Sequence, residues 1–272
     1  MNYNLVLSIC LATLAGLSTG IGGLISIFFK RTNKNVLALM LGFSAGIMIY
    51  ISFIELYQES QTNLCSIHGP VNGKILTVLS FFFGTTLTAL INELIPEPDH
   101  PHRVKKIESI YDNSLSTGYR SKEKLLRTGM FTAIAVTLHN FPEGLASYVS
   151  TMKSPALGIS IALAIAIHNI PEGIAISIPV FYATGSRKKA FWASLLSGLS
   201  EPLGALVAMA VLGRLISDTM FGIIFGAVAG IMVYISLDEL LPTSREYGQH
   251  NLSVLGLLLG MAVMALSVIF IF

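Results

Sequence analysis

Eight long apolar stretches divide the chain, and they constrain its fold more than any other feature of the sequence. Each is close to the roughly 20 residues that a helix needs to cross the hydrocarbon of a bilayer. They cover residues 5–29, 36–57, 75–95, 128–148, 156–182, 191–212, 220–241 and 252–272. The first stretch lacks a basic start and a small-residue cleavage motif, so we interpret it as a retained helix. The sequence therefore predicts an all-α polytopic membrane protein with eight transmembrane helices.

The composition agrees with lipid as the solvent of this chain. Hydrophobic residues make up 53% of its 272 residues and charged residues 12%, and the mean hydropathy is +0.71. Soluble domains typically carry about 25% charged residues. We expect a single transmembrane domain over residues 1–272, with residues 96–127 forming a polar loop between the third and fourth helices. The net charge of +2 gives no reason to expect a nucleic-acid partner.

The Lys and Arg residues, 17 in all, gather in alternate loops of the predicted topology. One set of loops holds Lys30, Arg31, Lys34, Arg103, Lys105, Lys106, Arg120, Lys122, Lys124, Arg127, Arg187, Lys188, Lys189 and Arg245. The other set holds Lys74, Lys153 and Arg214. Cytoplasmic loops near helix ends are enriched in Lys and Arg. We therefore expect a multi-pass protein of the cell membrane (plasma or inner membrane) with both termini outside the cytoplasm.

A segment of the second predicted helix recurs in the seventh. Residues 42–56 read GFSAGIMIYISFIEL, and residues 226–240 read GAVAGIMVYISLDEL without a gap. In the predicted topology these two helices cross the membrane in opposite directions. The match therefore predicts an inverted repeat, helices 1–3 against helices 6–8, around helices 4 and 5. Such repeats are typical of secondary transporters, which bind substrate near the midplane where the repeats meet.

One hexapeptide occurs in both central helices. The copy in the fourth helix, HNFPEG, begins at His139, and the copy in the fifth, HNIPEG, begins at His168. Residues four apart share a helix face, which pairs His139 with Glu143 and His168 with Glu172. Ionisable side chains are costly inside a bilayer, so they normally face a cavity and mark a path for substrate or protons. Packing alone is a poor explanation for two such copies.

Amide and carboxylate oxygens extend this set. Asn140 and Asn169 follow the two histidines, and Glu201 in the sixth helix can bridge to a second metal. Imidazole with carboxylate, and without thiolate, suits zinc and also iron, manganese, cobalt or cadmium. The all-oxygen sites of calcium and magnesium fit less well. The sequence thus predicts a transition-metal site within the membrane.

Other polar residues are weaker candidates. Glu55, Asp238 and Glu239 lie near helix ends, where they can serve as ligands at the entrance and the exit of a path. Carboxylates at such depths also reach interfacial water at little cost, so a purely solvated role stays open. His100 and His102 in the long loop can bind metal loosely, although we interpret them as solvated loop residues.

Three functions are compatible with a metal site in a helix bundle. A carrier that changes access from one side of the membrane to the other accounts for the repeat, and a metal-selective channel would use the same ligands. An intramembrane zinc hydrolase is the third, because zinc held by His and Glu with an open position activates water. The chain has no His-Glu-x-x-His motif, which argues against an enzyme.

Over nearly its whole length the chain resembles the ZIP (Zrt/Irt-like protein) metal transporters, and within them the bacterial ZupT-like branch. The two hexapeptides resemble the family signature of helices four and five, and SGLSEPLG at residues 197–204 resembles that of helix six. The chain departs from the family pattern after Glu55, where a proline is often found.

The resemblance implies a dimeric eight-helix bundle that takes up zinc, as transported substrate rather than as a prosthetic group, toward the cytoplasm. It also implies a binuclear centre. The ligands implied for one metal are His139, Glu143, His168 and Glu172, and those for the other are Asn140, Glu143, Asn169, Glu172 and Glu201.

Overall fold

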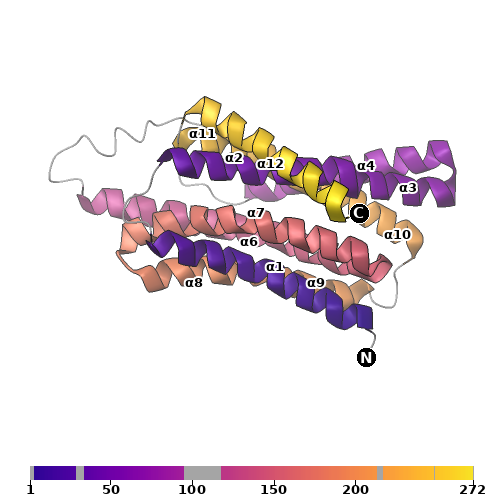
Figure 1. Cartoon of the computed structure of the whole chain (residues 1–272), viewed down its shortest axis with the longest axis horizontal. Coiled ribbons are helices and arrows are strands. Elements are labelled where there is room, and N and C mark those ends of the chain that lie inside the picture. Colours follow the sequence, from indigo (N-terminus) through magenta and orange to yellow (C-terminus); the bar gives the residue numbers. More distant parts are fainter. Residues whose placement is uncertain (1–2, 29–33, 95–117, 213–216, 248, 272) are drawn as a thin grey trace.

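The computed structural model describes residues 3–28, 34–94, 118–212, 217–247 and 249–271, and every regular element in these ranges is a helix (Figure 1). The all-α prediction is therefore confirmed for the described residues. The elements are α1 (Tyr3–Phe28), α2 (Lys34–Ile51), η1 (Ser52–Leu56), α3 (Tyr57–His68), α4 (Pro70–Leu94), α6 (Gly118–Lys153), α7 (Pro155–Thr184), α8 (Arg187–Gly198), α9 (Ser200–Leu212), α10 (Asp218–Ile235), η2 (Ser236–Leu240), α11 (Leu241–Tyr247) and α12 (His250–Ile271).

Seven helical segments in the described part of the chain are long and apolar enough to cross a membrane. They are Tyr3–Ile25, Asn35–His68, Pro70–Glu93, Pro155–Ile178, Arg187–Val211, Asp218–Arg245 and His250–Ile269. These segments match seven of the predicted spans. The one remaining predicted span is the fourth in chain order, residues 128–148. It lies within α6 and is not among the seven, so it stays a prediction.

Several helices run further than the sequence predicts, and α6 begins at Gly118, inside the predicted polar loop. The second predicted span continues as helix to His68, and the seventh continues to Tyr247. Each passes through a five-residue π-helical turn, η1 or η2, at the same position of the repeated segment. Wide turns of this kind are rare and frequently occur at functional sites.

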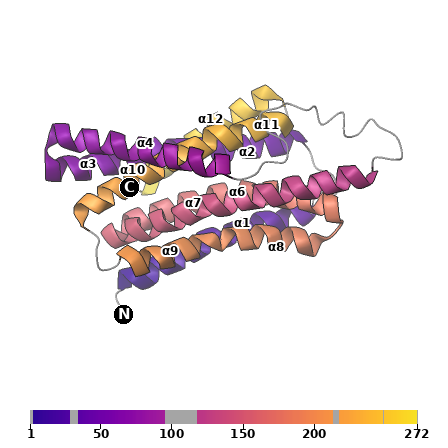
Figure 2. The ribbon, with the colours of Figure 1, turned by 180° about the vertical axis from the view of Figure 1, so that it is seen from behind.

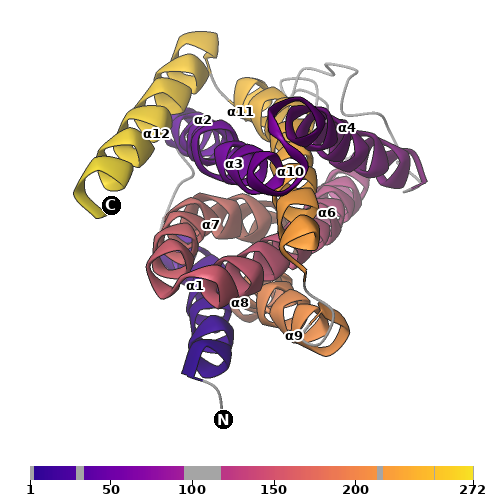
Figure 3. The ribbon, with the colours of Figure 1, turned by 90° about the vertical axis from the view of Figure 1, so that its right-hand side faces the viewer.

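The helices form two groups that are separated clearly in the end-on view of Figure 3. The first group contains α1, α6, α7, α8 and α9, and the second contains α2, α3, α4, α10, α11 and α12. The groups meet mainly where α2 packs on α7 and where α10 packs on α6. Figure 2 shows α6 crossing the middle of the molecule, between α9 of its own group and α10 of the other.

Glycines allow the backbones within each group to touch. A Cβ atom at Gly46 of α2 would overlap the backbone of Leu257 in α12, and one at Gly230 of α10 would overlap that of Phe81 in α4. For each helical glycine whose surroundings the structure describes, the nearest neighbours come from its own group. Small residues let membrane helices pack closely. In the described part of the chain, these close contacts are confined to the interior of each group.

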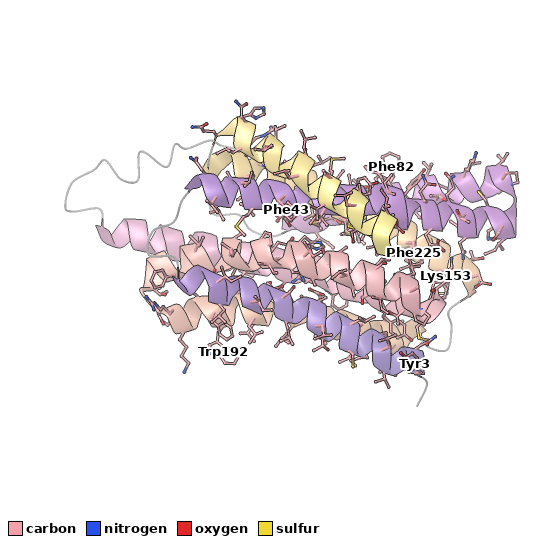
Figure 4. All side chains as sticks on the ribbon, in the orientation of Figure 1. Tyr3, Phe43, Phe82, Lys153, Trp192 and Phe225 are labelled. Atoms are coloured by element: carbon pink, nitrogen blue, oxygen red, sulfur yellow. The ribbon has the colours of Figure 1, made fainter. Side chains whose placement is uncertain are left out.

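The two matching segments run antiparallel. Near the start of α2, the Ala38 carbonyl accepts a hydrogen bond from Ser244 of α11 at 2.6 Å. At the other end of the continuous helix formed by α2, η1 and α3, Ser60 donates to the carbonyl of Gly222 in α10, also at 2.6 Å. Both chain termini lie toward one end of the bundle, together with Tyr3 and Lys153 (Figure 4).

Candidate metal centre

Three helices of the first group bury polar side chains at the middle of the bundle. We call these the central polar cluster: Asn140, Glu143, His168, Asn169, Glu172 and Glu201. Each is at most 1% exposed. They come from α6, α7 and α9, and α6 and α7 continue as helix through the proline of their hexapeptide. The side chain of His139 lies outside the described residues, so its predicted pairing with Glu143 stays a prediction.

The two hexapeptides meet through an imidazole and a carboxylate. Nε2 of His168 lies 3.3 Å from Oε1 of Glu143 on the neighbouring helix. Glu172 lies within electrostatic range of the same imidazole. The structure therefore brings together His168, Glu143 and Glu172, three of the residues that the sequence predicts as ligands.

A second contact joins α7 to α9. The side-chain amide of Asn169 donates to Oε1 of Glu201, and it lies 3.1 Å from the carbonyl oxygen of Ala15 in α1. Glu143 and Glu172 both lie within electrostatic range of Glu201. Carboxylates crowded into a dry site repel one another unless protons or a cation compensate their charge. The cluster thus favours a cation.

Several oxygen atoms of the cluster have no hydrogen-bond partner in the described part of the chain. They are Oδ1 of Asn140, Oε2 of Glu143, Oδ1 of Asn169 and Oε2 of Glu201. A buried polar atom without a partner costs about 1–3 kcal/mol, and water or an ion is the usual explanation. All four are metal-ligating atom types, so a divalent cation would satisfy several of them at once.

The last residue of each hexapeptide sets how closely a neighbouring helix approaches. A Cβ atom at Gly144 would overlap the backbone of Glu201 in α9, and one at Gly173 would overlap the backbone of Thr19 in α1. Both glycines therefore pack directly against the backbone of a neighbouring helix. The contact at Gly144 places the backbone of Glu201 against α6.

The His, Cys, Asp and Glu side chains of the described residues do not by themselves form a complete metal site. Among the described residues, no group of three or more His, Cys, Asp or Glu side chains is arranged so that it could hold a metal ion. The amide oxygens of Asn140 and Asn169 do not belong to these residue types, and His139 is not described at side-chain level. The transition-metal site that the sequence predicts therefore stays a prediction.

The weaker candidates lie on the two π-helical turns of the second group. Glu55 is partly buried in η1, and Asp238 and Glu239 belong to η2. Asp238 accepts a hydrogen bond of 2.9 Å from the amide of Asn92 in α4. Asn92 and Glu239 line a cavity of about 290 Å³ between the two groups, which Phe141 and Pro142 of α6 also line. His100 and His102 lie outside the described residues.

Two polar residues that contact predicted ligands were not identified from the sequence. Asn92 holds Asp238, and Ser44 of α2 contacts Glu172, with 3.3 Å between the Ser44 hydroxyl and Oε1. Ser44 lies within the repeated segment, which is the only sequence signal that draws attention to it. Nothing in the sequence around Asn92 distinguishes it from a residue at the end of a span.

Comparison with known proteins shows which family this chain resembles in sequence. Residues 96–267 match the family model described as ZIP Zinc transporter. A protein named Zinc transporter ZupT from Clostridium perfringens is 49% identical over 276 residues, covering 98% of this chain and 96% of its own length. Proteins of the same name from Chlorobium chlorochromatii and Lysinibacillus sphaericus are each 51% identical, with 99% of both chains covered.

Proposed function

The chain belongs to the ZIP zinc transporter family, and from this premise we propose that it imports zinc into the cytoplasm through the central polar cluster. It is a multi-pass membrane protein of a family of transporters rather than enzymes. The hydrolase alternative is therefore set aside. Iron, manganese, cobalt and cadmium are proposed as further substrates, because His and Glu ligands bind all of them.

The observation that carries the proposal is the set of buried ligand atoms without partners. Oxygen atoms of Asn140, Glu143, Asn169 and Glu201 are enclosed at the centre of a bundle that spans a membrane. A structural core would satisfy these atoms or replace them with apolar groups. A site that must take up and release an ion keeps them available instead.

We assign the ligands to two metals that share carboxylates. His139, Glu143, His168 and Glu172 would hold one metal, and Asn140, Glu143, Asn169, Glu172 and Glu201 the other. The contact between His168 and Glu143 supports the first assignment, and the contact between Asn169 and Glu201 supports the second. Glu55, Asp238 and Glu239 are proposed as ligands on the path to and from this centre.

Movement of the two helix groups against each other would change access to the site. The antiparallel course of the repeated segments supports the inverted repeat on which such carriers are built. The site residues all belong to the first group, and the cavity beside Pro142 and Glu239 lies between the groups. That cavity lies next to the last turns of α4, which lead to the loop that the charge pattern assigns to the cytoplasm. The homodimer that the resemblance implies stays a prediction.

Uptake of labelled zinc into proteoliposomes tests the site. We expect Glu143→Ala and His168→Ala to abolish most uptake, while Ser150→Ala, which removes a buried hydroxyl bonded to its own helix, retains it. All variants should be reconstituted in equal amounts. Parental uptake by the Glu143 and His168 variants would refute the assignment of the central cluster.

A second measurement separates a carrier from a channel and defines the substrates. Uptake that saturates at low metal concentration with slow turnover supports a carrier, whereas currents far above carrier rates support a channel. Competition among zinc, iron, manganese, cobalt and cadmium at two pH values would rank the substrates. It would also reveal proton coupling, because protonation of imidazole and carboxylate releases metal.

A further inference from the structure

Ser44 is the residue of α2 whose hydroxyl reaches into the central polar cluster. It is fully buried. Its hydroxyl oxygen lies 3.3 Å from Oε1 of Glu172 and 3.3 Å from the carbonyl oxygen of His168, both on α7. A hydroxyl has one proton to donate, so it serves one of these acceptors at a time.

The hydroxyl of Ser44 does not use the carbonyl of its own helix as acceptor, and in this it resembles Ser60 and Ser244. Serine in a helix commonly donates back to a carbonyl one turn earlier. Ser18, Ser52 and Ser236 do so, with donor to acceptor distances of 2.5, 2.6 and 2.7 Å. The hydrogen bonds of Ser44 instead go to another helix, which indicates that its hydroxyl serves α7 rather than α2.

The repeat shows that a hydroxyl is not needed to build this part of the helix. The residue that matches Ser44 in the second copy is Val228, and it is buried in the hydrophobic core. Both copies keep the flanking glycines, which pack on a neighbouring helix. A β-branched apolar residue therefore fits the same local helix, and the hydroxyl at Ser44 requires a separate reason.

We propose that Ser44 is a positioning residue that orients the Glu172 carboxylate for metal binding. The inference deepens the proposed function and rests on it, because it takes Glu172 to be a metal ligand. A carboxylate side chain has several rotatable bonds, and fixing one oxygen of Glu172 restricts where the other can lie. Hydrogen bonds to ligating carboxylates commonly tune metal affinity in this way.

The position of Ser44 also makes its contact sensitive to the arrangement of the helices. Ser44 belongs to the second group and Glu172 to the first, so the hydrogen bond exists only while α2 and α7 keep the observed register. At 3.3 Å it is already longer than the usual 2.7–2.8 Å of a hydroxyl bond. A shift of about 1 Å would break it, since such bonds weaken rapidly with distance. Glu172 would then be oriented in one arrangement and released in the other.

Equilibrium binding of labelled zinc to purified protein in lipid nanodiscs tests the proposal. Thr and Val have the same shape and differ by the hydroxyl, so Ser44→Thr and Ser44→Val form a matched pair. We expect Ser44→Thr to bind within about twofold of the parent. Ser44→Val and Ser44→Ala should bind about threefold to tenfold more weakly, as expected for loss of one long hydrogen bond of ordinary strength.

A second arm shows whether Ser44 acts through Glu172. In a Glu172→Ala background, Ser44→Ala should cause no further loss of zinc affinity, because the acceptor is already gone. Ser52→Ala, which removes a hydroxyl bonded to its own helix, should bind zinc like the parent. Thermal melting of each variant checks that it is folded. A loss of folded protein would lower zinc binding in any variant, whichever residue is replaced.

Two results would overturn the proposal. One is equal zinc affinity of the Thr and Val variants. If neither branched side chain fits, parental zinc affinity of Ser44→Ala is the result that overturns the proposal. The other is a further loss on adding Ser44→Ala to Glu172→Ala. If Glu172→Ala alone binds zinc like the parent, the ligand assignment behind the proposed function fails instead, so the two failures are distinguishable.

Discussion

Replacing Gly144 by alanine should displace a predicted ligand without altering any ligand chemically. The Cβ atom of that alanine would lie 2.6 Å from the carbonyl carbon of Glu201 and 2.8 Å from its Cα atom. Carbon atoms in contact normally lie about 3.5–4.0 Å apart. Helices α6 and α9 must therefore separate by roughly 1 Å at this point, and the backbone of Glu201 moves with α9.

The expected effects on stability and on binding differ in size. Overpacking of this kind costs about 1–3 kcal/mol of folding stability. Metal ligands tolerate only about 0.2 Å of displacement from zinc to oxygen distances of about 2.0–2.2 Å. A displacement of about 1 Å at Glu201 therefore removes this ligand, and zinc affinity should fall about tenfold or more.

Gly84→Ala provides the control for this experiment. Its Cβ atom would lie 2.9 Å from the Cα atom of Ala227 in α10, which is a similar overlap inside the second helix group. Both variants should melt at lower temperature, but zinc binding by equilibrium dialysis should fall only for Gly144→Ala. Zinc affinity within twofold of the parent for Gly144→Ala, or an equal loss for Gly84→Ala, would refute the reasoning.

Other consequences of the structure are open to measurement. Lys153 of α6 pairs with Glu59 of α3 across the two groups. Cysteines placed at these two positions, in a chain whose Cys10 and Cys65 are replaced by serine, can be joined by a cleavable crosslinker. The crosslink should halt zinc uptake, and its cleavage should restore it. Glu239→Gln should slow uptake while central zinc affinity stays within about twofold, because Glu239 lines the cavity beside the cluster. Zinc at about 100 times its dissociation constant should stabilise the protein by about 2.7 kcal/mol, and a chelator should reverse this.

Seven of the predicted spans are confirmed in the described residues, and the candidate ligands on them were identified from local patterns alone. Apolar length alone identifies the membrane segments, and the spacing of His168 and Glu172 places them on one helix face before any packing is known. Hydropathy reports burial in lipid rather than helicity, which is why it ends the second span at residue 57 although the helix continues to His68.

What the sequence does not predict depends on contacts between distant elements. The π-helical turns η1 and η2 contain neither glycine nor proline, so no breaker residue marks them. Ser44 and Asn92 gain their roles from acceptors on other helices, 128 and 146 residues away along the chain. The glycine that ends each hexapeptide is evident in the sequence, but the partner of Gly144 is known only once α6 and α9 are packed.

The distribution of tight packing explains how such a site can be both rigid and accessible. The glycine contacts that hold the described backbones together fall inside each helix group, and two of them, at Gly144 and Gly173, lie directly beside the central polar cluster. If the groups move as proposed, this packing would carry the helices of the cluster together with the first group. Between the groups, Ser44 and the pair of Lys153 with Glu59 make contacts through side chains, and a cavity lies next to Glu239. Under the proposed carrier mechanism, sliding along this boundary would break a few side-chain contacts, among them that of Ser44 with Glu172, rather than backbone packing. Access would then change while the helices that carry the ligands stay packed together.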